Sequence, residues 1–204
     1  SGIQALDNIT TGDRNSGIGF KSLKYLNTGK DNTGVGYQSG LELTSGSYNT
    51  AVGAYALNVS ETNSYNTAIG YYSLKNTISG YNTAIGYYSL MSNTTGEHNT
   101  AIGALALEMT STANYNTAVG HSASENNTTG GYNTALGYKA SEVNTTGQYN
   151  TAIGNESLQW NNASYNTAVG FQALEGGSST ATGEQNVAVG IYALDDNNLS
   201  LIHI

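Results

Sequence analysis

Histidine and carboxylate side chains are the groups of this chain that could act in catalysis or hold a metal ion. The three histidines are far apart in the sequence, at His98, His121 and His203. A pair of carboxylates could hydrolyse a glycosidic bond, but the acidic residues are scattered, and the one adjacent pair is Asp195 and Asp196. Asn198 could add an amide oxygen to that pair for a cation such as calcium. The histidines and acidic groups fit solvated surface positions better, so we expect no enzyme activity, no metal and no cofactor.

Tyrosine is the second residue type with binding chemistry, and the chain has 16 of them. The pairs Tyr71–Tyr72 and Tyr87–Tyr88 occupy equivalent places 16 residues apart. Adjacent residues of a strand point to opposite faces, so one tyrosine of each pair is expected to face outward. These four residues are the candidate surface contact for a glycan or a host-cell surface. The structural alternative is a ladder of stacked rings.

Threonine recurs at one position and raises a different class of function. Flat rows of threonine on a solenoid can order water and bind ice. The row consists of Thr50, Thr67, Thr83, Thr100, Thr117, Thr134, Thr151 and Thr167. We place threonine on the same face as the neighbouring aliphatic residue, which is expected inside, and this argues against an ice-binding row. Ice binding is the alternative function if the two faces are reversed.

These residues belong to a tandem repeat that runs the length of the chain. The motif Asn-Thr-Ala-(Ile/Val)-Gly, or a close variant, begins at Asn15, Asn32, Asn49, Asn66, Asn82, Asn99, Asn116, Asn133, Asn150, Asn166 and Asn186. Successive copies are 16 or 17 residues apart, except for 20 residues between the last two. A repeat of this length has no room for a strand and a 10-residue helix, so the pattern predicts a solenoid of stacked coils.

Each copy is interpreted as one coil with two short strands. Alternation puts threonine and isoleucine on one face, expected inside, and asparagine and alanine on the other. A leucine four or five positions further on, as at Leu74 and Leu107, supplies the rest of the core. Turns of the Asn-Thr-Thr-Gly type, as at 93–96, close the coil. The chain has no proline, which agrees with strands that are paired on both sides.

The predicted fold is therefore all-β, a parallel β-solenoid or β-roll of about 11 to 12 coils with 16 to 17 residues each. We assign residues 1–194 to one solenoid with a longer loop near 175–184, and 195–204 to a tail or a further coil. Two structural ladders are expected. The asparagine ladder is Asn49, Asn66, Asn82, Asn99, Asn116, Asn133, Asn150 and Asn166, and the glycine ladder is Gly53, Gly70, Gly86, Gly103, Gly120, Gly137, Gly154 and Gly170.

Composition excludes several classes of partner. The net charge is −8 with only 6 basic residues, so a nucleic-acid backbone is not an expected ligand. No run approaches 18 apolar residues, so no membrane insertion is expected. Two aliphatic side chains for each coil make a thin core. Burial between chains would add to it, and we expect a homotrimer that could also stack end to end into a filament.

The motif and the Tyr-x-(Ala/Ser)-Leu that follows it resemble the head repeats of trimeric autotransporter adhesins. The resemblance covers residues 1–194 and is clearest at 49–53 and 82–86. It implies a left-handed parallel β-roll with three chains to a head. Similar repeats occur in phage and viral tail fibres. The adhesin unit is shorter, and threonine here replaces its Ser-Val.

The resemblance implies an extracellular fibre segment, on a cell surface or a virion surface, which gives rigid, multivalent attachment. The expected partners are further copies of the chain and a host-cell surface or glycan. Ice binding is the first alternative. A polysaccharide-processing tail-fibre segment is the second.

Overall fold

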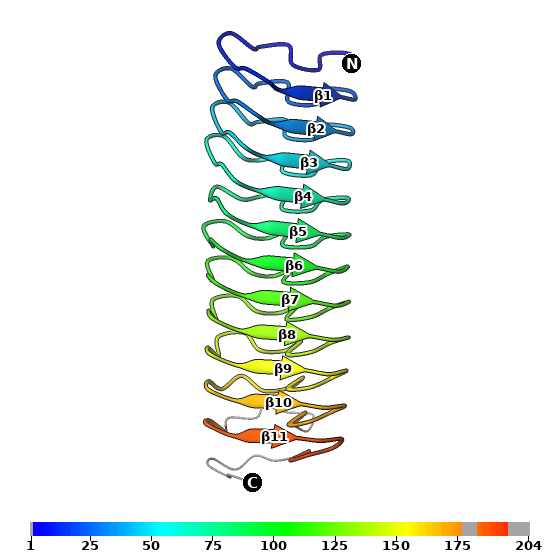
Figure 1. Cartoon of the computed structure of the whole chain (residues 1–204), viewed down its shortest axis with the longest axis vertical. Helices are drawn as coiled ribbons and strands as arrows, with labels where there is room; N and C mark the ends of the chain where they lie inside the picture. Colours follow the sequence, from blue (N-terminus) through cyan, green and yellow to red (C-terminus); the bar gives the residue numbers. More distant parts are fainter. Residues whose placement is uncertain (1, 177–182, 196–204) are drawn as a thin grey trace.

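The chain folds as a parallel β-solenoid, a straight rod in which every coil lies on the one before it (Figure 1). The computed structural model describes residues 2–176 and 183–195. Several positions named above lie outside the described residues: His203, Asp196 and Asn198, most of the longer loop, and the tail from residue 196. The eleven described strands make about ten turns, which confirms the predicted fold class.

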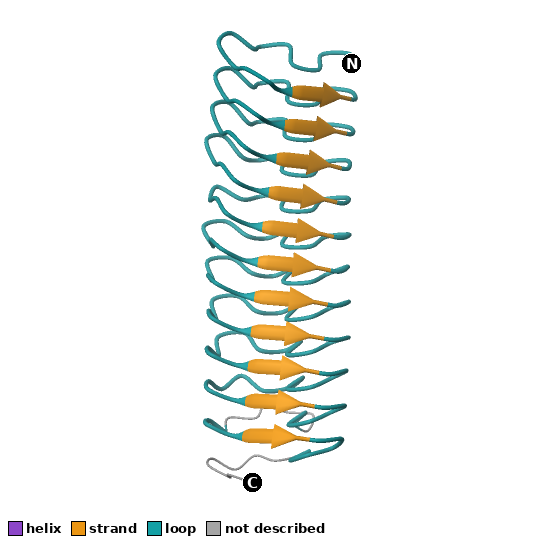
Figure 2. Ribbon diagram, viewed as in Figure 1, coloured by secondary structure: helices purple, strands orange, loops and turns teal. Residues whose placement is uncertain are grey.

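One short strand from each coil joins a single parallel sheet (Figure 2). The strands are three residues long: β1 Ser16–Ile18, β2 Thr33–Val35, β3 Thr50–Val52, β4 Thr67–Ile69, β5 Thr83–Ile85, β6 Thr100–Ile102, β7 Thr117–Val119, β8 Thr134–Leu136, β9 Thr151–Ile153, β10 Thr167–Val169 and β11 Val187–Val189. Equivalent residues pair throughout, as Thr67 does with Thr83. Among the described residues there is no helix able to cross a membrane.

The longer spacing between the last two motifs does not disturb this register. Thr167 pairs with Val187 although 20 residues separate them, and Ala168 pairs with Ala188. A coil can therefore be longer without shifting the strand that follows.

The returning wall of each coil is not a second strand, contrary to the expectation of two strands per coil. Every other residue there has a left-handed backbone, with φ of 57° at Tyr72 and 50° at Leu74. A β-strand requires negative φ throughout. The wall still bonds to both neighbouring coils, because Leu74 N–H donates to the Ser89 carbonyl at 3.0 Å and Tyr72 N–H to the Ala54 carbonyl at 3.1 Å.

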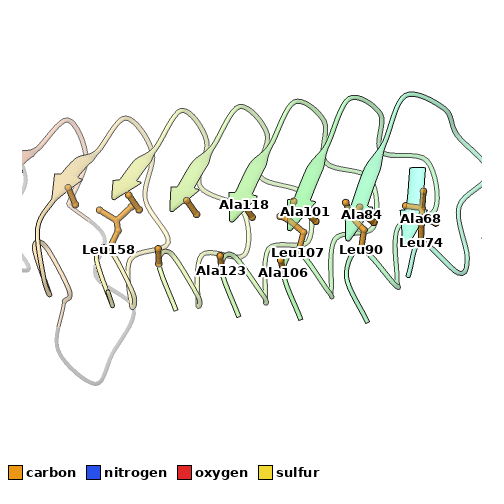
Figure 3. Close-up of a cluster of buried hydrophobic side chains, with 14 of the residues drawn as sticks. Ala68, Leu74, Ala84, Leu90, Ala101, Ala106, Leu107, Ala118, Ala123 and Leu158 are labelled. Carbon is orange, nitrogen blue, oxygen red and sulfur yellow. The ribbon is translucent and has the colours of Figure 1, made fainter. Parts of the chain in front are cut away.

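The core is built from the alanine of the strand and the leucine of the returning wall (Figure 3). Ala84, Ala101, Leu90 and Leu107 are all fully buried. The expectation that the motif isoleucine and valine lie inside is wrong: Ile102, for example, remains 37% exposed. The coil is too narrow for branched side chains from both walls, so the smaller residue of the strand faces inward and the larger one faces out.

Asparagine lies on the inner face and forms the predicted ladder. The Asn99 side chain is 1% exposed, and its Oδ1 accepts the backbone N–H of Asn116 at 3.0 Å. Its Nδ2 donates to the Ala113 carbonyl at 2.8 Å. Equivalent bonds recur from Asn32 to Asn186. Each asparagine thus joins its own coil to the next and also fixes the turn that closes the coil.

Glycine after each strand turns the chain out of the sheet. Gly103 has a φ of +132°, and a Cβ at this position would lie 2.4 Å from the carbonyl oxygen of Gly120. The same contact, at 2.2 to 2.7 Å, would occur at the equivalent glycines from Gly19 to Gly170. Only glycine tolerates both this backbone and this approach, so a glycine recurs at the end of each strand.

Candidate binding surfaces

The outer face of the sheet carries one row of threonine and one row of aliphatic residues. Because alanine points inward, Thr67 and Ile69 of β4 both point outward. The aliphatic row is half-buried to exposed, with Ile69 and Ile153 at 37% and Leu136 at 45%. We call the threonine and aliphatic rows together the sheet face. It runs along all eleven strands, with Ser16 and Val187 in the threonine row at its two ends.

A continuous stack of aromatic rings borders the sheet face on the side where the chain enters each strand. The rings belong to Tyr48, Tyr65, Tyr81, His98, Tyr115, Tyr132, Tyr149 and Tyr165. Consecutive centroids are 4.9 to 5.1 Å apart and the planes differ by 4 to 15°. We call this the tyrosine stack. It confirms the ladder interpretation, and its inner members present ring edges to solvent because their two ring faces are covered.

An ion pair takes the place of tyrosine in the first two coils. Arg14 Nε lies 2.6 Å from Asp31 Oδ1, and Arg14 Nη2 lies 2.7 Å from Asp31 Oδ2. The hydrogen bonds and charge of Arg14 lower the pKa of the half-buried Asp31 carboxyl, and Asp31 raises the pKa of the guanidinium. From Tyr48 onward, no position of the tyrosine stack or of the sheet face is charged in the sequence, apart from the titratable His98.

The candidate tyrosine pairs do not point to opposite faces, because they lie in the bend after the glycine and not in a strand. The rings of Tyr71 and Tyr72 touch edge-on at 4.3 Å, and those of Tyr87 and Tyr88 lie 4.2 Å apart. A hydrogen bond with Tyr72, followed by burial, raises the pKa of Tyr71 to about 12. Tyr71 and Tyr87 are exposed, Tyr72 and Tyr88 half-buried. Their role as a surface contact stays a prediction.

A second aromatic column lies where the chain leaves the sheet, at the position directly after the motif glycine. We call it the post-glycine column, and its described members are Phe20, Tyr37, Ala54, Tyr71, Tyr87, Ala104, His121, Tyr138, Asn155, Phe171 and Ile191. Phe20 stacks on Tyr37 at 5.3 Å, and Tyr71 on Tyr87 at 5.8 Å. The column is interrupted at Ala54, Ala104 and Asn155. The interruptions are visible in the sequence once the copies are aligned, but pairs of adjacent tyrosines do not reveal them.

Histidines and carboxylates are not brought together into a catalytic or metal centre in the described part of the chain. His98 belongs to the tyrosine stack, and His121 Nδ1 lies 2.9 Å from Ser122 Oγ. No three His, Asp or Glu residues among those described are arranged to hold a metal ion. One shallow depression of about 360 Å³ is lined by Tyr25, Glu42, Thr44 and Glu61.

A row of glutamates on the returning wall is the densest charge of one sign. Glu108, Glu125 and Glu142 occupy equivalent places in successive coils. Burial, followed by repulsion from Glu125, raises the pKa of the Glu108 carboxyl. Glu142 is compensated by Lys139 at 3.2 Å and by the Gln159 amide at 2.5 Å. These contacts explain the row as a solvated charged wall that lies away from the sheet face.

Comparison of the chain with protein-family models, with curated proteins and with solved structures gave no match.

Proposed function

We propose that this chain is a structural segment of an extracellular fibre, in which three copies associate side by side through the sheet face. The observation that carries the proposal is the outward-facing aliphatic row on an uncharged sheet. Soluble monomers rarely expose one continuous apolar surface of this extent. Covering it with an equivalent face would bury the side chains that the thin coil cannot hold inside.

The size of the surface fits this role. Ten steps of about 4.8 Å between eleven strands give a length of about 50 Å. The five residues from the tyrosine stack to the aliphatic row span about 16 Å in extended chain. The resulting area of about 800 Å² per chain equals that of one standard pairwise interface, and in a trimer two neighbours would share it.

The distribution of charge also supports association through this face. A chain of net charge −8 repels its copies in general. Glu108, Glu125 and Glu142 lie on the returning wall and would remain in solvent in the assembly. Among the described residues, the charged positions in the column that continues the tyrosine stack are Arg14 and Asp31, which form an ion pair. Copies can therefore approach through the sheet face without burying an unpaired charge.

A rigid rod of repeated coils suits multivalent attachment. Weak contacts repeated along the rod, and on three chains, gain avidity without any single strong site. The resemblance of the motif to the heads of trimeric autotransporter adhesins and to tail-fibre repeats supports a place on a cell or virion surface. The proposed partners are other copies of the chain and a host-cell surface or glycan.

Molar mass in solution, measured by light scattering, tests the assembly. We expect three times the chain mass of 21.2 kDa. Ile102→Asp places a charge in the aliphatic row and should reduce the mass to that of one chain. Ile78→Asp is the matched control, because Ile78 is 62% exposed but lies in a turn outside the sheet. A wild-type mass of one chain, or an unchanged mass for Ile102→Asp, would contradict the proposal.

Ice binding is the second candidate, and the corrected orientation of the strands favours it. Threonine points outward on a flat sheet, with a hydroxyl and a methyl group in each strand from β2 to β10. The bulky tyrosine stack beside the row makes the surface less flat, which is why we place this function second. Thermal hysteresis of a monomeric sample tests it. Thr100→Ala together with Thr117→Ala should lower the hysteresis, and the absence of hysteresis in the wild type would eliminate the candidate.

A further inference from the structure

We propose that the interruption of the post-glycine column at Asn155 is a binding slot for one pyranose ring of a glycan. The inference rests on the proposed attachment function and names the place and the ligand class. The slot has Tyr138 of the preceding coil as one wall, Phe171 of the following coil as the other, and Asn155 as its floor.

A sugar ring needs a free aromatic face, and few rings of this rod have one. The C–H-bearing face of a pyranose is apolar and packs flat on an aromatic ring. In the tyrosine stack, a ring such as Tyr132 has neighbours at 5.0 Å on both faces. Tyr71 and Tyr87 likewise stack on each other at 5.8 Å. Ring faces become accessible where a coil lacks an aromatic residue in the post-glycine column.

The gap at Asn155 has the width of one inserted ring. Tyr138 and Phe171 are two coils apart, a separation of about 9.6 Å along the rod. A ring midway would lie about 4.8 Å from each wall, within the range of 4.5 to 7 Å for paired rings. Both wall residues are partly exposed, Tyr138 at 44% and Phe171 at 37%, and Asn155 is exposed as well. The flexible Lys139 side chain, whose Nζ lies 5.7 Å from the centroid of the Tyr138 ring, would move aside for the sugar.

Polar groups beside the slot match the hydroxyl groups of a sugar. The residues that follow Tyr138, Asn155 and Phe171 are Lys139, Glu156 and Gln172. Gln172 Nε2 donates to Glu156 Oε2 at 2.7 Å, which holds an amide and a carboxylate side by side at the slot. With the Asn155 amide, these groups offer both donors and acceptors. A purely apolar aromatic guest would leave them unused, so a pyranose with its apolar face and polar edge fits better.

The other two interruptions differ in ways that single out Asn155. At Ala54, the Tyr55 ring lies edge-on to Tyr37 at 5.2 Å and to Tyr71 at 6.3 Å, so the chain itself covers the gap. At Ala104, the floor is a methyl group and the next residue is Leu105, so the gap lacks the polar rim. The Ala104 gap therefore serves as an internal control of the same width.

The decisive variant is Asn155→Tyr, which closes the slot with the aromatic residue that other coils carry at this position. Because Tyr37, Tyr87 and Tyr138 occupy equivalent places, the variant is expected to fold. Ala104→Tyr closes the control gap. Asn155→Ala keeps the slot open but removes the amide.

Binding is measured by saturation-transfer NMR with free glucose, galactose, mannose and N-acetylglucosamine, and by titration of the sugar that responds. We expect a Kd of about 1 mM for one monosaccharide, at least about tenfold weakening in Asn155→Tyr, and about threefold to tenfold weakening in Asn155→Ala. Ala104→Tyr should bind as the wild type does. Wild-type affinity in Asn155→Tyr, or no response from any of the four sugars, would contradict the proposal of a sugar-binding slot at Asn155.

Light scattering on the same samples separates this inference from the proposed function. Asn155→Tyr should have the wild-type mass, because the post-glycine column lies beyond the sheet face. A trimer that binds none of the sugars would contradict the proposed sugar-binding slot but would agree with the proposed fibre assembly. A monomer whose sugar binding is lost in Asn155→Tyr would support the slot and contradict the assembly.

Discussion

Removal of one ladder asparagine should cost far more stability than its small, uncharged side chain suggests. Asn99→Ala removes the acceptor of the Asn116 backbone N–H and the donor to the Ala113 carbonyl. Both backbone groups lie at buried positions, since Asn116 is 1% and Ala113 2% exposed. An orphaned buried polar group costs about 1 to 3 kcal/mol, so the expected loss in the free energy of unfolding is about 2 to 6 kcal/mol.

Urea denaturation followed by circular dichroism measures this loss. Thr95→Ala is the matched control, because Thr95 lies on the exposed turn of the preceding coil; it should change the free energy of unfolding by less than about 0.5 kcal/mol. Asn99→Asp should also destabilise, because it keeps the acceptor but loses the donor to Ala113. A loss below about 1 kcal/mol for Asn99→Ala would refute the view that the ladder satisfies otherwise unpaired backbone groups.

Three further predictions follow from the core, the glycine ladder and the glutamate row. Leu107→Ala should cost about 2 to 5 kcal/mol in the free energy of unfolding, because this side chain is fully buried; a loss under about 1 kcal/mol in urea would contradict its place in the core. Gly103→Ala should lower the melting temperature sharply, since its Cβ would lie 2.4 Å from the Gly120 carbonyl oxygen; a wild-type melting curve would show that this approach is not obligatory. Burial raises the pKa of Glu108, so the folded chain holds this proton at higher pH than the unfolded chain, and stability should rise as pH falls from 7 toward about 5. Glu108→Gln should weaken this trend in urea titrations and stabilise the chain at neutral pH, whereas an unchanged slope would argue against it.

The period of the motif was sufficient to predict the solenoid, its parallel sheet and both ladders. It was not sufficient to orient the strand. Alternation separates Thr67 and Ile69 from Asn66 and Ala68, but it does not say which set faces inward. Hydrophobicity favoured isoleucine, and that choice was wrong. A signal was present in the repeats: the inward position holds only alanine or glycine from Gly17 to Ala188, as a confined space requires.

The sequence did not predict the backbone conformation of the returning wall. Left-handed φ values at Tyr72 and Leu74 are unusual for such bulky residues, and only one copy has a glycine at the position of Leu74, Gly40 with a φ of +60°. The neighbouring coils impose these values by bonding to the wall on both sides. Strand alternation does not apply to Tyr71 and Tyr72 for the same reason, although one tyrosine of each pair, Tyr71 or Tyr87, is exposed as expected.

The undisturbed pairing of Thr167 with Val187 across the lengthened coil bears on how the number of repeat units can change in evolution. A gene that encodes near-identical units can gain or lose one by unequal recombination, and each event would change the length of the rod by about 4.8 Å. The cross-section would stay the same, because each unit carries its own ladder asparagine and a small inward strand residue, and most units carry their own wall leucine. The length of such a rod can therefore be selected in steps of one unit. Residues that differ between units, such as Asn155, give a single coil a surface that the other coils lack.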